Sequence, residues 1–157
     1  MDDNKPKHLL IVYHSQSGRN ERLAYAARAA ALAAESEVDV RLLRAAEAGT
    51  RDVIWCDGLL LFMPENFGAI AGGMKDFFDR SYYPVLAREL IRPYGVCICT
   101  GNDGSNALRQ WERIAKGFGW RMVADPVVCF GDPSAEAFRH AEDLGAALAV
   151  GLVLGVF

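Results

Sequence analysis

The stretch HLLIVYHSQSGRN, residues 8–20, decides the fold. It begins with a continuous apolar run, which is typical of a strand buried on both faces of a parallel sheet. A short loop of small polar residues and a glycine follows. Residues 21–34 are mostly alanine and other strong helix formers, so a helix is predicted directly after the loop. The chain therefore opens with a strand, a polar loop and a helix.

The same alternation continues to the end of the chain. Further strands are predicted at residues 38–43, 59–63 and 95–100, with a fifth strand split into 120–123 and 127–130 by Asp125-Pro126. Helical segments are predicted at residues 45–55, where the signal is weak, and at 72–83, 106–116 and from Ser134 onward. Parallel neighbours need crossover connections, and right-handed crossovers place helices on both faces of the sheet. We therefore expect an α/β fold, with a three-layer, doubly wound, five-stranded parallel sheet.

Length and composition limit the class of protein. The 157 residues are 52% hydrophobic and 24% charged, which suits a single domain over residues 1–157. Its first seven residues, 1–7, form a polar N-terminal tail. The net charge of −3 argues against a nucleic-acid partner, because such partners are bound through an excess of Lys and Arg. The uncharged segment 144–157 is too short to span a bilayer, and the tail lacks the apolar core of a secretory signal. We expect a cytoplasmic protein with no membrane span.

Four cysteines are present, Cys56, Cys97, Cys99 and Cys129. They form no C-x-x-C pair and have no histidine at zinc spacing, so no metal site is expected. Most of them lie in apolar runs, which predicts buried free thiols in a reducing compartment. Cys97 and Cys99 would face the same side of one strand, where neighbours along the strand are poorly placed for a disulfide.

The candidate site lies beyond the carboxyl ends of the strands, where open α/β sheets bind their ligands. After the first predicted strand, residues 15–20 combine two hydroxyls, a glycine that can adopt positive φ and the start of a helix. This pattern predicts a cup of backbone N–H groups suited to a phosphate dianion, with Arg19 adding charge at the rim. The alternative is structural: Ser17 would cap the helix and Gly18 would turn the chain.

Two further loops meet the same edge of the predicted sheet. Residues 64–80 contain Phe67 and three glycines, so a flat ring could stack on Phe67 while backbone groups reach its polar edge. The alternative is that Phe67 fills the core. Residues 100–105 hold two glycines and small polar side chains, which would let a ligand approach the backbone closely, although a simple turn explains them equally well.

Together the three loops resemble those of the flavodoxin-like family. Residues 15–20 are similar to its FMN phosphate loop, (S/T)-x-(S/T)-G-x-(N/T), and residues 64–80 are similar to the P-x-x-x-G…G-x-x-K-x-F-x-D-R segment of NAD(P)H-dependent FMN and quinone reductases. The resemblance covers nearly the whole chain and implies the strand order 2-1-3-4-5, counted along the sequence. It also implies FMN as cofactor, bound by Ser15, Gln16, Ser17, Gly18, Arg19, Asn20, Pro64, Glu65, Asn66, Phe67, Gly68, Thr100, Gly101, Asn102 and Asp103.

The resemblance implies an oxidoreductase that passes electrons from NAD(P)H to a quinone, another small acceptor or a redox protein. Flavodoxins that act as carriers usually place a tyrosine in the loop after the fourth strand, but residues 100–104 contain no aromatic residue. One flavin face would then be open, which favours a reductase. Two alternatives remain open: a one-electron carrier that needs a partner reductase, and an interaction module without flavin. No side chain is assigned as catalytic, and Glu65 and Asp103 are candidates for lowering the flavin's potential.

Other phosphate-handling classes lack their required residues. A receiver domain needs paired acids after the first strand, where Tyr13-His14-Ser15 stands instead, and no Walker motif G-x-x-x-x-G-K-(S/T) occurs. The loop after the first strand holds no cysteine for a phosphatase. At the other end of the chain, the apolar residues 150–157 exceed what a covering helix needs, which would suit a homodimer contact.

Overall fold

The computed structural model describes residues 5–157 and contains one mainly parallel sheet. The strands are β1 (Lys7–Tyr13), β2 (Val38–Arg44), β3 (Gly58–Asn66), β4 (Ala69–Ile70), β5 (Pro93–Thr100), β6 (Arg121–Met122) and β7 (Val127–Phe130). The helices are α1 (Arg19–Ala34), α2 (Thr50–Trp55), α3 (Gly72–Leu86), α4 (Ser105–Phe118) and α5 (Ala135–Leu154). The sheet runs β2-β1-β3-β5-β6, with β7 also paired to β5 and β4 paired antiparallel to the end of β3.

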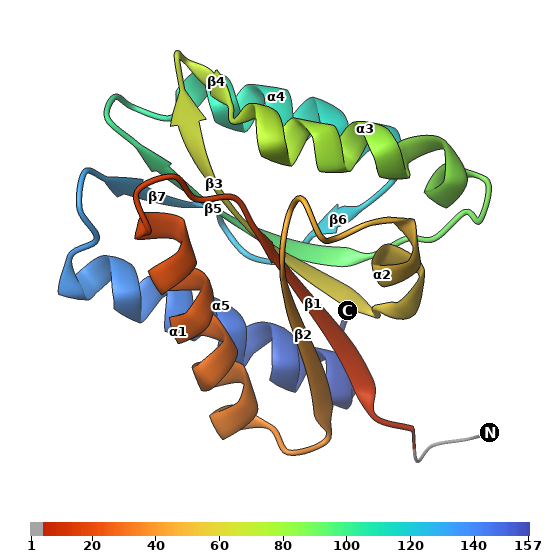
Figure 1. Cartoon of the computed structure of the whole chain (residues 1–157). Coiled ribbons are helices and arrows are strands. Elements are labelled where there is room, and N and C mark those ends of the chain that lie inside the picture. Colours follow the sequence, from red (N-terminus) through yellow and green to blue (C-terminus); the bar gives the residue numbers. More distant parts are fainter. Residues whose placement is uncertain (1–4) are drawn as a thin grey trace.

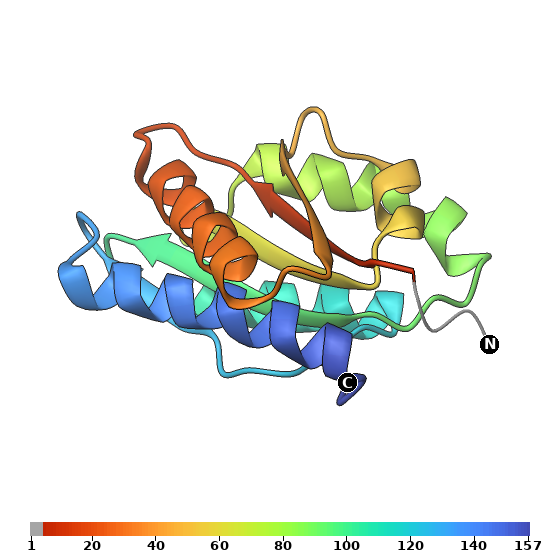
Figure 2. The same ribbon diagram turned by 90° about the horizontal axis from the view of Figure 1, so that it is seen from below.

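Helices cover both faces of the sheet, as the buried strands require. Figure 1 shows α3 and α4 on one side and α1 and α5 on the other, and α1 and α5 also lie side by side in Figure 2. Successive residues of β1 point to opposite faces, so Leu10 and Val12 pack beneath α3 and α4, whereas Leu9 and Ile11 pack beneath α1 and α5. All four side chains are fully buried. The continuous apolar run of β1 is thus explained by two separate cores.

The contact between α1 and α5 depends on a glycine. A Cβ atom at Gly145 would lie 2.1 Å from the carbonyl oxygen of Ala27, far inside normal contact distance. The backbones of the two helices therefore approach each other at a point that only glycine allows. Alanines of α1, including Ala24 and Ala31, are fully buried in the same core, and their small side chains allow the two helices to pack closely.

The predicted α/β fold and strand order are confirmed. The five predicted strands correspond to β1, β2, β3, β5 and a fifth position shared by β6 and β7, both of which pair with β5. The break between them contains Asp125-Pro126, as the sequence indicated. The added strand, β4, turns the end of β3 into a short hairpin.

Several predicted boundaries are wrong, two of them at proline. β3 continues through Pro64 to Asn66. The pairing of β1 with β3 ends at Phe62, so no strand on the β1 side needs the backbone N–H that Pro64 lacks. α3 continues through Pro84 to Leu86, where burial of Val85 in the core supports the last turn. Residues 1–4 of the predicted tail lie outside the described residues, and Lys7 already belongs to β1.

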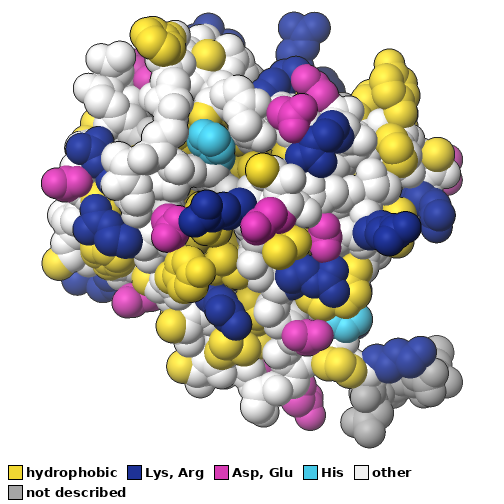
Figure 3. Space-filling view, in the orientation of Figure 1, with side chains coloured by type: hydrophobic (Ala, Val, Ile, Leu, Met, Phe, Trp, Pro, Cys, Tyr) yellow, Lys and Arg dark blue, Asp and Glu magenta, His cyan; other side chains and the backbone are white. Residues whose placement is uncertain are grey.

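The surface carries charges of both signs. On the face shown in Figure 3, Lys and Arg side chains lie among Asp and Glu side chains. Some charged side chains of the molecule form ion pairs, such as Lys75 with Asp79 and Arg80 with Asp76. Within residues 5–157, no helix has the length and apolar character needed to cross a membrane.

Candidate functional site

The loops that follow β1, β3 and β5 converge on one cavity at the carboxyl edge of the sheet. The cavity has a volume of about 230 Å³. Its lining includes nine of the residues expected to bind a cofactor, together with Cys99: Gln16, Ser17, Arg19, Asn20, Pro64, Glu65, Asn66, Thr100 and Gly101. Segments that are far apart in the sequence are therefore brought together as the loop patterns predicted.

The remaining expected residues lie around this cavity. Gly68, Asn102 and Asp103 line a neighbouring hollow of about 440 Å³, which shares Glu65 with the first. Ser15, Gly18 and Phe67 line neither space. The two spaces meet at Glu65, so the candidate site is a small polar cavity that continues into a shallower one.

The loop after β1 is shaped by Gly18, which is the N-cap of α1. Its φ of 85° lies in the left-handed region that favours glycine, and its N–H donates to Ser15 Oγ at 3.0 Å. The structural alternative was therefore right about Gly18 turning the chain and wrong about Ser17, since no side chain caps this helix. The Ser17 hydroxyl is left free to meet a ligand in the cavity.

Four backbone hydrogen-bond donors of this loop and of the first turn of α1 have no partner within residues 5–157. They are the backbone N–H groups of Gln16, Ser17, Arg19 and Asn20, all residues of the cavity lining. Asn20 is also only 2% exposed, and its side-chain Oδ1 has no hydrogen-bond partner in the described chain. An unpaired buried polar group costs about 1–3 kcal/mol. The loop therefore holds an unsatisfied polar side chain beside a row of unpaired donors at a helix N-terminus.

The positive charge at the rim is partly neutralised. Arg19 Nε lies 3.0 Å from Asp132 Oδ1, and Arg22 Nη2 lies 3.7 Å from the same oxygen. The expected rim charge of Arg19 is thus paired with a carboxylate that the sequence analysis did not single out. The Asp132 side chain is highly exposed, so its attraction to either arginine is weak and open to competition by an anion.

The loop after β3 is fixed by hydrogen bonds to the other two loops. Asn66 Nδ2 donates to Gln16 Oε1 at 2.7 Å, which joins it to the loop after β1. Glu65 accepts from the Thr100 hydroxyl at 2.8 Å and from the Ala107 N–H at 3.3 Å, which joins it to the end of β5 and the start of α4. Glu65 therefore serves as a structural link as well as a carboxylate at the site.

Two residues that hold this loop were missed by the sequence analysis. Asn106 Nδ2 donates to the Gly68 carbonyl, and the Ile70 N–H donates to Gln110 Oε1 at 2.9 Å. Both side chains come from α4, whose helical pattern gave no reason to separate them from other surface residues. Their role depends on how α4 packs against the hairpin, which the local sequence does not indicate.

Phe67 lies at the tip of the β3–β4 hairpin and is fully exposed, with a φ of 51°. The alternative that it fills the core is therefore wrong. The left-handed backbone region is sparsely populated by aromatic residues. Such residues adopt it mainly where the surrounding structure enforces it. The hydrogen bond from Asn106 to the neighbouring Gly68 provides that constraint.

The loop after β5 forms a capping turn before α4. Asp103 Oδ1 accepts from the Ser105 N–H at 3.0 Å and from the Ser105 hydroxyl at 2.9 Å, and these bonds lower the pKa of Asp103. Ser105 is the first residue of the helix and Gly104 is its N-cap, so the helix begins one residue before the predicted start at residue 106. Thr100 belongs to the strand and is buried. Gly101 is exposed at the first cavity, and Asn102 and Asp103 are exposed at the shallower hollow.

The prediction of buried free thiols is confirmed for all four cysteines. Cys97, Cys99 and Cys129 belong to the core beneath α1 and α5, whereas Cys56 belongs to the opposite core. Within residues 5–157, no group of three or more His, Cys, Asp or Glu side chains is arranged to hold a metal ion. Cys99 differs from the others because it lines the cavity at the carboxyl edge.

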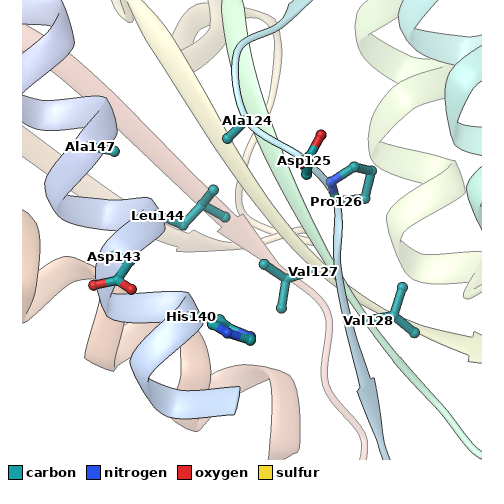
Figure 4. Close-up of a pocket in the computed structure, with 9 residues that line it drawn as sticks. All are labelled: Ala124, Asp125, Pro126, Val127, Val128, His140, Asp143, Leu144 and Ala147. Atoms are coloured by element: carbon teal, nitrogen blue, oxygen red, sulfur yellow. The ribbon is translucent and has the colours of Figure 1, made fainter. Parts of the chain in front are cut away.

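A separate hollow of about 480 Å³ lies between α5 and the segment that leads into β7 (Figure 4). Its walls are mostly aliphatic, with His140 and Asp143 of α5 at the edge. The lining reaches only Val127 and Val128, the first residues of β7, so this hollow is away from the carboxyl edge where the three loops meet. It brings together none of the residues that the sequence predicted for the site.

Comparisons with known proteins agree with this architecture. No protein-family model matches the chain. A flavodoxin of Aquifex aeolicus is 35% identical over 71 residues, which cover 45% of this chain and 38% of that protein's length. The match therefore spans well under half of that relative.

Solved structures match over most of the chain. An archaeal flavodoxin superposes with a TM-score of 0.81 at 15% identity, covering 92% of this chain and 98% of the other. The flavodoxin of Megasphaera elsdenii gives 0.77 at 22% identity, covering 90% and 98%. A WrbA-like flavodoxin of Agrobacterium tumefaciens gives 0.75 at 20% identity, covering 92% and 96%. The strand order and these structural matches together show that the chain has a flavodoxin-like fold.

Proposed function

We propose that this chain binds FMN at the carboxyl edge of its sheet and transfers electrons through it. The observation that carries the proposal is the loop after β1, where unpaired N–H groups and the buried, unpaired amide of Asn20 face one cavity. These donors at a helix N-terminus fit a phosphate dianion. The Asn20 amide offers both a donor for a phosphate oxygen and an acceptor for a ribityl hydroxyl. Binding would thus remove an unfavourable feature of the free protein.

The residues of the site have separable tasks in this proposal. FMN supplies hydride and electron transfer when it is bound, so the protein contributes binding, orientation and local charge. Ser17, Asn20 and the loop amides would hold the phosphate, and Arg19 would turn from Asp132 toward it. Glu65 lies where the two spaces meet, and the exposed ring of Phe67 lies at the tip of the neighbouring hairpin, outside the lining of both spaces. Both side chains would flank the flat part of the cofactor. Burial of the exposed Phe67 ring against that surface would add apolar stabilisation.

We further propose that the electron donor is NAD(P)H and that the acceptor is a quinone or a similar small molecule. Support comes from the loop after β5, whose residues Gly101 to Asp103 are exposed and carry no aromatic ring. A Cβ atom added at Gly101 would meet no other atom within 4 Å. One side of a bound flavin would therefore be open to a second flat molecule, as a reductase requires.

A second candidate is a carrier that receives electrons from a partner reductase. It is favoured by the sequence match to a flavodoxin and by structural matches to proteins named as flavodoxins. The two candidates share FMN binding and differ in whether the protein oxidises NAD(P)H by itself. A module without flavin is the remaining alternative, and it would leave Asn20 unpaired.

The test is an FMN titration followed by anaerobic addition of NADPH, with NADH in parallel. We expect saturable FMN binding, read from flavin fluorescence, and bleaching of the flavin absorbance by the nicotinamide alone. Bleaching only after a separate reductase is added would support the carrier. Absence of FMN binding would contradict both redox functions.

A further inference from the structure

The core beneath α1 and α5 contains a group of three thiols next to the candidate site. Cys99 of β5 and Cys129 of β7 are register partners on neighbouring parallel strands, and Cys97 lies two residues before Cys99. The Cys99 thiol interacts with both of the other thiols. Cys99 lines the cavity of about 230 Å³, whereas Cys97 is fully buried. A small solute in the cavity would therefore meet Cys99 first.

Strand geometry selects the partner of Cys99. Neighbouring strands lie about 4.8 Å apart, which is within the roughly 4.4–6.8 Å that Cα atoms of a disulfide span. Residues two apart on one strand are about 6.6 Å apart, at the upper limit of that range, with Cβ atoms that point in the same direction. The Cβ atoms of residues opposite each other on neighbouring strands lie about 4.5–5.5 Å apart, so Cys129 needs a shift of roughly 1 Å to reach the about 3.5–4.5 Å that a disulfide spans. Cys97 lies farther from Cys99 than Cys129 does.

The surroundings also make the two thiols chemically unequal. The Cys97 thiol hydrogen-bonds to Cys99 and lowers its pKa, and the charges of Arg19 and Arg22 act in the same direction against the effect of burial. Burial raises the pKa of Cys129 to about 11. Burial raises the pKa of the distant Cys56 to about 12. Cys99 is thus the member of the group with the greatest thiolate character, which is what oxidation requires.

We propose that Cys99 is oxidised by hydrogen peroxide and that Cys129 resolves the product into a disulfide between β5 and β7. The Cys99 thiolate attacks one peroxide oxygen, the O–O bond breaks, and the departing hydroxide takes up a proton to form water. Cys99 is then a sulfenic acid. The Cys129 sulfur attacks the Cys99 sulfur, the S–O bond breaks, and a second water leaves with the Cys129 proton. Two thiols are oxidised to one disulfide while one peroxide is reduced to two waters.

Peptide mapping of the full chain tests this proposal, and it needs no flavin. The protein is treated with hydrogen peroxide, remaining thiols are blocked with N-ethylmaleimide, and tryptic peptides are analysed without reduction. We expect the peptides 89–109 and 122–139 to become joined with the loss of two hydrogen atoms, and to separate again after dithiothreitol. A wild-type protein that keeps four blocked thiols at peroxide levels that oxidise a reactive thiol would overturn the proposal.

Alanine variants assign the two roles. Cys99→Ala should remove the joined peptide, while Cys129→Ala should stop at a Cys99 sulfenic acid that dimedone traps. Cys56→Ala is the matched control and should retain the joined peptide, whereas Cys97→Ala removes the thiol that lowers the pKa of Cys99 and should only slow formation of the joined peptide. A joined peptide that persists in Cys99→Ala would show that Cys97 is the reacting thiol and would overturn the assignment. The result is independent of FMN binding, so it stands or fails separately from the proposed function.

Discussion

The loop after β1 and the hairpin formed by β3 and β4 both contribute to the lining of the same cavity, but their hydrogen bonding differs. In the first loop, four backbone N–H groups and the Asn20 side chain have no partner within residues 5–157. In the hairpin, the Ala71 N–H donates to the Pro64 carbonyl at 3.2 Å, and Glu65, Gly68 and Ile70 are all bonded to other segments. The loop after β1 thus contains polar groups without hydrogen-bond partners, whereas the polar groups named in the hairpin have theirs.

This difference separates binding from support. Polar groups left unpaired in a buried place destabilise the free protein, and a ligand that pairs with them recovers that energy on binding. Groups that are already paired stabilise the free protein and contribute to a ligand only by holding shape. Substitutions in the first loop should therefore change FMN affinity more than stability, and substitutions in the hairpin should do the reverse.

The largest effect is expected for Asn20→Ala. Loss of a hydrogen bond to a charged group costs about 1.5–3 kcal/mol, so FMN should bind roughly ten- to a hundredfold more weakly. The free protein should keep its stability, because the amide makes no hydrogen bond through Oδ1 there. FMN fluorescence titration and urea unfolding of the flavin-free protein measure the two quantities. A loss of stability without a loss of affinity would reverse the assignment of this loop.

A smaller effect is expected for Glu65→Ala, and it should fall on stability. The variant leaves the buried Thr100 hydroxyl and the Ala107 N–H without their acceptor. We expect the free energy of unfolding to fall by about 1–2 kcal/mol. Glu65→Gln keeps one acceptor oxygen and should recover part of this loss. Glu142→Ala, at an exposed position of α5, is the control and should unfold at the wild-type urea concentration.

The smallest effect is a pH dependence carried by Asp103. The Ser105 N–H and hydroxyl lower the pKa of this carboxyl below its ordinary value of 3.8. A carboxyl with a lowered pKa in the folded state contributes stability above its unfolded pKa, and the contribution is lost as pH falls through the folded pKa. The difference in urea midpoint between wild type and Asp103→Asn should thus be present at neutral pH and shrink below pH 3.8. A constant difference across that range would show that the charge of Asp103 has no part in it.

Local patterns in the sequence predicted the elements that depend on local physics. The apolar run that ends at Tyr13 predicted a strand buried on both faces, and the Gly18 turn with the alanines that follow predicted a helix. The same patterns failed at Pro64 and Pro84, because the cost of a missing N–H depends on whether a partner strand or a buried neighbour stands beside it. Asn106 and Gln110 gave no signal because their partners are more than thirty positions away, on the hairpin.

From the amino-acid order alone, the alternation of buried strands and helices follows, and so does the placing of three small polar loops at one edge of a parallel sheet. Periodicity and turn chemistry act over a few residues, so they can be recognised without the rest of the chain. The tertiary structure decided which polar groups find partners. Asn20 Oδ1 has no hydrogen-bond partner in the described chain, whereas the Glu65 carboxylate accepts two hydrogen bonds. Cys99 lines a cavity and also stands opposite Cys129. Those outcomes depend on contacts between distant segments, and only packing determines them.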